Sequence, residues 1–177
     1  AIAEADVILF VVDRQTGLTP ADRLTASILR QQIGDREEEK KIILVVNKCD
    51  SERQEDEATE FWEMGFDKLL CISAEHGRGF YELWIEILAK LPPAEPNFDP
   101  EDDDGSEIRV AVLGRPNIGK STLVNRLVGE ERQVVHDMPG TTMDAVDSVF
   151  TVGDRTWRIV DTAGIRRKAR IDDRLET

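Results

Sequence analysis

The chain has 177 residues, enough for one well-buried core or for two partial domains that each complete their core elsewhere. Its formal net charge is −13, and no basic stripe offsets the acidic excess, which argues against a nucleic-acid clamp. No apolar run could span a bilayer and no segment reads as a signal peptide, so we expect a cytoplasmic protein without a membrane partner.

Apolar runs of strand length recur along the chain. The runs at 7–12 and 42–46 are continuous, which is typical of strands buried on both faces of a parallel sheet covered by helices. A shorter run at 69–72 and another at 108–113 predict two further strands. The segments 148–152 and 156–160 flank Gly153 and Asp154 and predict a β-hairpin. The pattern as a whole predicts an α/β fold with a mostly parallel sheet.

Helices are expected between these runs. Residues 19–22 supply an N-cap threonine, a proline at the first helical position and an acidic residue three positions after the cap. The helix that starts there should end near Gly34 and keep Leu24 and Ile28 on one face. Further helices are predicted over 55–64, over 122–128, and over the stretch whose core-facing residues are Phe80, Leu83, Trp84, Ile87, Leu88 and Leu91.

The two cysteines give no sign of a metal site. Cys49 and Cys71 each end an apolar, strand-like run, which favours small core residues in a reducing compartment.

Residues 92–107 are proline-rich and acidic, with one large apolar side chain, and cannot bury enough surface to fold alone. We interpret them as a linker. It separates residues 1–91 from residues 108–177. These parts are predicted either to be the last half of one domain and the first half of the next, or to pack together as a single permuted domain.

The clearest motif follows the strand at 108–113. Residues 114–121 fit the phosphate-binding pattern G-x-x-x-x-G-K-[ST], and a helical pattern follows, as such a loop requires. Lys120 can reach the terminal phosphates and Ser121 can offer its hydroxyl to Mg²⁺. The residues expected to contact the phosphates are Gly114, Arg115, Pro116, Asn117, Ile118, Gly119, Lys120, Ser121 and Thr122.

A second motif, N-K-x-D, ends the strand at 42–46 and has the chemistry to read guanine. The amide of Asn47 can face the O6 and N7 edge, and the carboxylate of Asp50 can accept from N1–H and the 2-amino group. Adenine would leave that carboxylate unmatched, so a site of this kind rejects it. Lys48 belongs to the same motif, and a backbone N–H from Ser73, Ala74 or Glu75 could reach the base oxygen.

Two further stretches suit a nucleotide switch. Asp161 and Gly164 form a D-x-x-G motif after the hairpin, where the carboxylate can hold Mg²⁺ through water and the Gly164 N–H can meet a γ-phosphate. Thr142, which we prefer over Thr141, can complete Mg²⁺ coordination. The predicted catalytic residues are therefore Lys120, Thr142, Asp161 and Gly164.

Together these motifs resemble the Era-like GTPases, and most closely the Der (EngA) family of bacterial ribosome-assembly GTPases with tandem G domains. The resemblance covers nearly the whole chain. It is carried by the stretches 5–22, 47–50, 73–79, 109–132, 139–148 and 160–168. It implies a P-loop NTPase three-layer sandwich that hydrolyses GTP to GDP with Mg²⁺ bound by Ser121, Thr142 and Asp161.

The resemblance also implies finer properties. Asn117 would help to hold K⁺ against the phosphates, and Ile165, where Ras-like switches have a water-orienting Gln, would leave intrinsic hydrolysis slow. Met143 stands where the family commonly has Arg, which affects switch contacts and not nucleotide binding. The expected partners are GTP or GDP and the large ribosomal subunit or its RNA, the latter through parts absent from this chain. We expect a monomer.

The order of the motifs is rotated, because the base-reading residues precede the phosphate-binding residues. A circularly permuted GTPase would give this order. So would a window from late in one G domain to partway through the next, which we favour because the chain lacks an initiating Met and breaks off in the charged stretch 165–177. In that window the two motif sets would serve different nucleotides, and the isolated piece could be inactive. A third alternative is a non-catalytic acidic interaction fragment with incomplete sites.

Overall fold

The computed structural model describes residues 2, 5–33, 41–91, 107–130, 148–152 and 155–160. No helix within these ranges is long and apolar enough to cross a membrane. The elements, in chain order, are β1 (Val7–Asp13), η1 (Arg14–Thr16), α1 (Pro20–Ile33), β2 (Ile42–Asn47), α3 (Glu52–Glu57), η2 (Ala58–Met64), β3 (Leu69–Cys71), α4 (Phe80–Lys90), β4 (Ile108–Leu113), α5 (Lys120–Glu130), β5 (Ser148–Val152) and β6 (Arg155–Val160).

The strands form one six-stranded sheet in the order β3-β2-β1-β4-β6-β5. All neighbouring strands are parallel except the hairpin β5–β6. The predicted α/β fold with a mostly parallel sheet is therefore confirmed. The central pairing, β1 with β4, runs from Val7 opposite Val110 to Phe10 opposite Leu113. Strands from 1–91 and from 108–177 thus share one sheet, which is the arrangement expected of a permuted domain.

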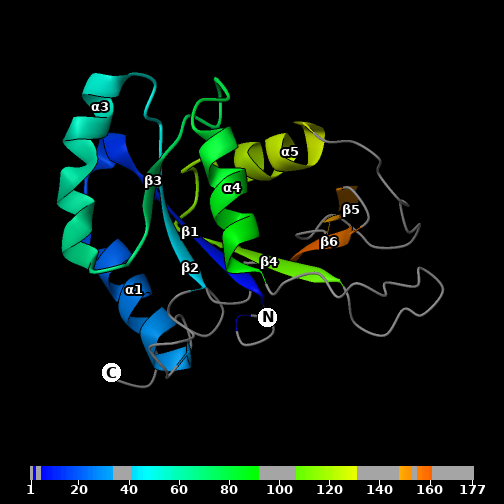
Figure 1. Ribbon diagram of the computed structural model, residues 1–177. Helices are drawn as coiled ribbons and strands as arrows, with labels where there is room; N and C mark the ends of the chain where they lie inside the picture. Colours follow the sequence, from blue (N-terminus) through cyan, green and yellow to red (C-terminus); the bar gives the residue numbers. More distant parts are fainter. Residues whose placement is uncertain are drawn as a thin grey trace.

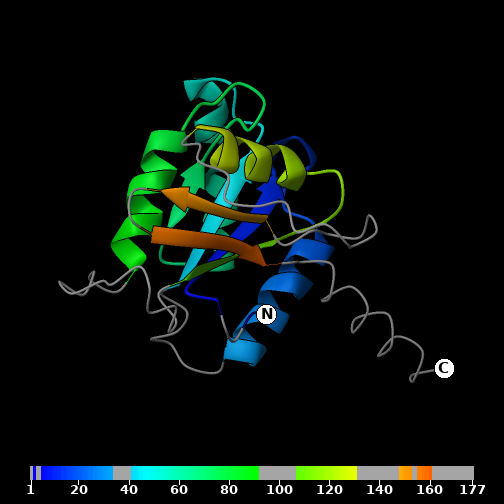
Figure 2. The ribbon, with the colours of Figure 1, turned by 90° about the vertical axis from the view of Figure 1, so that its right-hand side faces the viewer.

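Helices cover both faces of the sheet. α4 and α5 lie on one side, and α1 and α3 lie on the other (Figures 1 and 2). Successive side chains of a strand point to opposite faces. Accordingly Leu9 and Val11 of β1 join the cluster under α4 and α5, while Ile8 and Phe10 join the cluster under α1 and η2. This burial on both faces explains why the strand sequences are continuously apolar.

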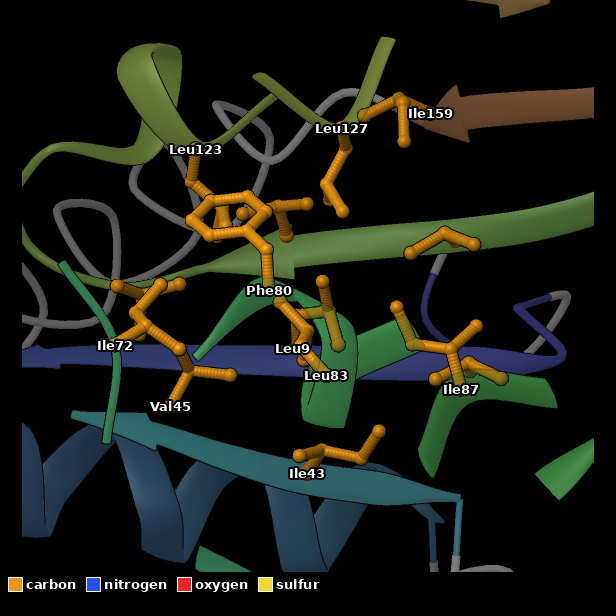
Figure 3. Packing of buried hydrophobic residues seen from close by; sticks show 14 of the residues in the cluster. Leu9, Ile43, Val45, Ile72, Phe80, Leu83, Ile87, Leu123, Leu127 and Ile159 are labelled. Carbon is orange, nitrogen blue, oxygen red and sulfur yellow. The ribbon is translucent and has the colours of Figure 1, made fainter. Parts of the chain in front are cut away.

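The cluster under α4 and α5 is built from both parts of the chain (Figure 3). Phe80 and Leu83 of α4 meet Leu123 and Leu127 of α5 above the sheet. Nearby, the rings of Trp84 and Trp157 pack edge to face with centroids 5.3 Å apart. The two parts therefore share a hydrophobic core as well as a sheet.

Two predicted core positions are wrong. Leu24 is 59% exposed and Leu88 is 51% exposed. The inward face of α1 instead carries Asp22, Ala26 and Leu29. Asp22 points inward to polar partners, and two residues further along a helix the side chain faces the opposite way, so Leu24 is left in solvent.

The helix predicted over 55–64 starts earlier and changes type. It begins as α3 at Glu52, tightens to the 3-10 segment η2 at Ala58, and ends at Gly65, whose φ of 70° gives a left-handed cap. The tightened turns bring Phe61 and Met64 into the core under α1, which local propensity does not specify.

Candidate functional site

The motif residues gather at the carboxyl edge of the sheet. Asp13 ends β1 opposite Asn47, which ends β2, and the phosphate-binding loop starts directly after β4. Parallel strands present their carboxyl ends at a common edge, where α/β proteins bind ligands. The base-reading motif of 1–91 and the phosphate-binding motif of 108–177 are thereby neighbours.

Asn47 joins the two motifs directly. Its side-chain Nδ2 donates to the Ile118 carbonyl at 2.7 Å, and its Oδ1 accepts from the Ala74 N–H at 2.9 Å. The residue is only 3% exposed. One buried amide therefore connects the phosphate-binding loop to the loop at 73–75. The Ala74 N–H, one of the donors predicted for the base oxygen, is used here by Asn47.

The two glycines of the phosphate-binding loop allow its close approach to the first part of the chain. Gly114 has φ 143°, and a β-carbon there would collide with the Val11 carbonyl of β1. Gly119 has φ 93°, and a β-carbon there would collide with the Asn47 amide. No other residue fits at either position without displacing backbone or a buried side chain.

The start of α5 suits an anion. The Leu123 N–H bonds the Gly119 carbonyl at 2.9 Å, so the helix begins directly after the loop and its first N–H groups have no partner within the helix. Ser121 and Thr122 lie exposed in this first turn, while Ile118 is 2% exposed and anchors the loop in the core. The Lys120 ammonium donates to the Arg115 carbonyl across the loop.

The Asp50 carboxylate is oriented by the neighbouring loop. The buried Ser73 hydroxyl donates to Asp50 Oδ1 at 2.6 Å, and the His76 N–H donates to the same hydroxyl at 3.2 Å. The Asp50 side chain is 39% exposed. The carboxylate is therefore held in place yet accessible, as base recognition requires. Glu75, in the same loop as Ser73, is exposed.

Two residues of the site have unusual backbone conformations. Among the described residues only Lys48, at φ 68°, and Asn117, at φ 60°, are non-glycine residues with positive φ. Lys48 is held by its ammonium, 2.6 Å from Asp13 Oδ2, and by its carbonyl, which accepts from Arg14 Nε at 3.0 Å. Such strain persists where surrounding contacts fix it, and it clusters at functional sites.

Sequence reasoning missed Arg126 of α5. Its Nε donates to the Ala74 carbonyl at 2.9 Å, one Nη donates to the Glu75 carbonyl at 2.8 Å, and the guanidinium lies 5.7 Å from the Phe80 ring centroid. Arg126 thus fastens the base-side loop to the helix that follows the phosphate-binding loop. Its sequence context carries no signal for this, because an arginine on an amphipathic helix normally points to solvent.

A second unforeseen link starts from Arg115. Its Nε lies 2.9 Å from Asp22 Oδ1 and its Nη2 donates to Thr16 Oγ1 at 2.7 Å. The Asp22 side chain is fully buried, and its other oxygen accepts from the Thr19 hydroxyl and N–H, which confirms the predicted capping box. The phosphate-binding loop is therefore tied to the start of α1 by a buried carboxylate.

We expect Asp22→Ala to lower the free energy of unfolding by about 3–5 kcal/mol, because it leaves Arg115 and the Thr19 donors without their acceptor. Glu63→Ala is the matched control, since it breaks an ion pair to Arg23 whose side chains are 54% and 63% exposed. That pair should contribute less than about 1 kcal/mol. Urea unfolding of both variants gives the comparison, and equal losses would show that the buried link adds nothing.

Other predicted site residues, Thr142, Asp161 and Gly164, lie outside the described residues, as does Ile165. The structure describes β6 up to Val160, immediately before Asp161, and pairs Val160 with Ala111 of β4.

A family model described as 50S ribosome-binding GTPase matches residues 109–177. GTPase Der of Symbiobacterium thermophilum is 47% identical over 176 residues, which cover 99% of this chain and 36% of that protein. GTPase Der of Geobacter sp. strain M21 is 48% identical over 177 residues, 99% of this chain and 38% of that protein. The chain is homologous to GTPase Der.

The predicted resemblance to Der is thereby confirmed. The match covers 99% of this chain and therefore spans the regions of both motif sets. The chain spans 36–38% of the length of these two Der proteins.

Among solved structures, the crystal structure of YjeQ from Thermotoga maritima has a TM-score of 0.50 and 18% sequence identity, over 89% of this chain and 47% of that chain. At this identity the likeness shows a shared fold alone.

Proposed function

We propose that this chain forms one guanine-nucleotide site, with the base read by 1–91 and the phosphates bound by 108–177, and that it hydrolyses GTP to GDP. The observation that carries the proposal is the Asn47 side chain, bonded at 2.7 Å to the phosphate-binding loop and at 2.9 Å to the loop at 73–75. These two bonds hold the phosphate-binding loop beside the base-reading motif, as a shared site requires.

Different residues are proposed to bind the phosphates and to select the base. Lys120 and the N–H groups at the start of α5 stabilise phosphate charge in the ground state and in the transition state. Asp50, oriented by Ser73, selects guanine by accepting from its N1–H and 2-amino groups. Asn47 faces the other edge of the base, and its hydrogen bonds hold the phosphate-binding loop and the loop at 73–75 in place. With Ile165 where a water-orienting side chain would be needed, turnover is slow.

The donor set fits the proposed ions. Hydroxyl and carboxylate oxygens from Ser121, Thr142 and Asp161 are the ligands that Mg²⁺ prefers, and Ser121 is exposed in the first turn of α5. When bound, Mg²⁺ would neutralise charge between the β- and γ-phosphates. Asn117, held at positive φ in the loop, supplies an amide oxygen suited to K⁺.

The biological setting is proposed from the relatives. The family described as 50S ribosome-binding GTPase and the Der proteins point to a cytoplasmic switch in assembly of the large ribosomal subunit. Contacts with ribosomal RNA or protein would come from parts of a longer polypeptide, since this chain is acidic. The chain itself acts as a monomer.

Asp50→Asn tests the assignment of the base reader. An amide offers donors where guanine needs an acceptor, while xanthine has a carbonyl at that position. We expect GDP affinity to fall by about 100-fold or more, because charge-assisted hydrogen bonds contribute about 1.5–3 kcal/mol each, and XDP affinity to rise. Titration with fluorescent GDP and XDP measures both affinities.

Asp67→Asn is the matched control, because Asp67 is exposed and outside the site. It should leave both affinities unchanged. A folded Asp50→Asn protein with the same preference for GDP over XDP would refute the assignment.

A further inference from the structure

The two cysteines of this chain are neighbours in space. Cys49 follows β2 and Cys71 ends β3, in a parallel pair where Val46 lies opposite Cys71. The Cys49 N–H bonds the Ile72 carbonyl at 2.9 Å, which holds the two strand ends together. Both thiols are free, and Cys71 packs against the buried cluster under α1 that contains Cys49. The nucleotide site described above does not use either of them.

The thiols differ in access. Cys49 is completely buried, with its sulfur 3.6 Å from the Val46 carbonyl. Cys71 is half-buried and lines an open groove. The rim of the groove carries the ion pair of Arg78 and Glu55, 2.7 Å apart. A small reagent in solution can therefore reach Cys71, whereas Cys49 is shielded from solvent.

The thiols also differ in acidity. The neighbouring Cys49 side chain lowers the pKa of Cys71, against the opposing effects of burial and of the Glu55 charge. The pKa of Cys49 is raised by the Cys71 side chain, by burial and by the charge on Cys71. Since the thiolate is the reactive form, Cys71 is the nucleophile of the pair and Cys49 the proton-bearing partner.

We propose that Cys71 is an oxidation site for hydroperoxides, and that Cys49 converts the oxidised residue to an internal disulfide that weakens guanine binding. The Cys71 thiolate attacks one oxygen of hydrogen peroxide, the O–O bond breaks, and the hydroxide that leaves takes up a proton to become water. Cys49 then attacks the sulfur of the Cys71 sulfenic acid and gives its proton to the departing hydroxide, so that the S–S bond forms and a second water is released. Two thiols lose two electrons and one peroxide gains them.

The effect on nucleotide follows from the position of Cys49 between Lys48 and Asp50. A disulfide fixes its two sulfurs about 2 Å apart, so oxidation draws Cys49 toward β3 and moves both neighbours. This consequence rests on the proposed guanine site. The thiol chemistry does not, because both cysteines and every contact cited for them belong to 1–91.

The test uses the intact, reduced chain treated with hydrogen peroxide and analysed by mass spectrometry without reductant. We expect the mass to fall by two hydrogens per chain, with a peptide joining Cys49 to Cys71. Fluorescent GDP should then bind about tenfold more weakly, equivalent to about 1.4 kcal/mol, and dithiothreitol should restore both mass and affinity. Protein that binds no GDP even when reduced would refute the guanine site. The measured mass would still show whether Cys49 and Cys71 form a disulfide.

Single substitutions assign the roles. Cys71→Ser should keep its GDP affinity after peroxide and show no loss of hydrogens, whereas Cys49→Ser should retain a sulfenic acid that dimedone labels at Cys71. Cys49→Ala repeats the second experiment if the serine perturbs the core. Dimedone labelling of Cys49, a disulfide between two chains, or no oxidation would overturn the proposal. An internal disulfide with unchanged GDP affinity would overturn its regulatory part.

Discussion

Replacing Asn47 with alanine is expected to abolish detectable GDP binding and to lower the free energy of unfolding by about 2–6 kcal/mol. The substitution leaves the Ile118 carbonyl and the Ala74 N–H without their partner in a site that is 3% exposed. Each buried group left unpaired costs about 1–3 kcal/mol. Urea unfolding measures the stability, and titration of fluorescent GDP measures the affinity.

Asn125→Ala is the matched control, because Asn125 is exposed on α5. It removes the same kind of side chain from the helix that follows the phosphate-binding loop. It should change neither the stability nor the GDP affinity. A loss of GDP binding at unchanged stability would mean that Asn47 contacts the base but does not join the two loops.

Gly119→Ala is expected to weaken GDP binding by at least about 100-fold, which corresponds to about 3 kcal/mol. At φ 93° an alanine is strained, and its β-carbon would lie 2.3 Å from the Asn47 amide nitrogen, which is too close for contact. Asn47 is short and held by hydrogen bonds at both ends, so it cannot move aside cheaply. The measurement is again titration of fluorescent GDP, with circular dichroism to verify folding.

Gly129→Ala provides the control on the same helix. No heavy atom lies within 4 Å of a β-carbon built at Gly129, and alanine is the better helix former. This variant should bind GDP normally and gain up to about 1 kcal/mol of stability. Equal affinities of the two alanine variants would contradict the contact between Gly119 and Asn47.

The strands could be predicted from sequence because their chemistry is local. The runs at 7–12 and 42–46 are apolar at every position, and both are buried on both faces of the sheet. The start of α1 was equally readable, since Thr19 and Asp22 cap the helix by bonds to each other. The phosphate-binding and base-reading motifs could also be placed from sequence, because each directly follows a strand that its own apolar run predicts.

The contacts that join the motifs could not be predicted, because they link residues far apart in the chain. Nothing near Arg126 indicates that its guanidinium bonds the carbonyls of Ala74 and Glu75. Nothing near Leu24 indicates that Asp22 turns inward to Arg115 and leaves the leucine 59% exposed. Such pairings depend on the complete fold.

Chain order and sheet order are separable in this protein. The base-reading strands come first in sequence, yet β1 and β4 pair in the centre of the sheet. Domains tolerate new termini where chain ends and connections lie at the surface. A stretch with its motifs in rotated order can therefore bring the base-reading and phosphate-binding motifs to one sheet edge, as the bonds of Asn47 illustrate.

Both motif sets are proposed to bind the same nucleotide. This can be decided by calorimetric titration of the chain with GDP, repeated with Asp50→Asn and with Lys120→Ala. We predict one GDP per chain, and a large loss of that single binding event in either variant. Two independent binding events, each sensitive to only one of the variants, would mean that the two motif sets serve separate nucleotides.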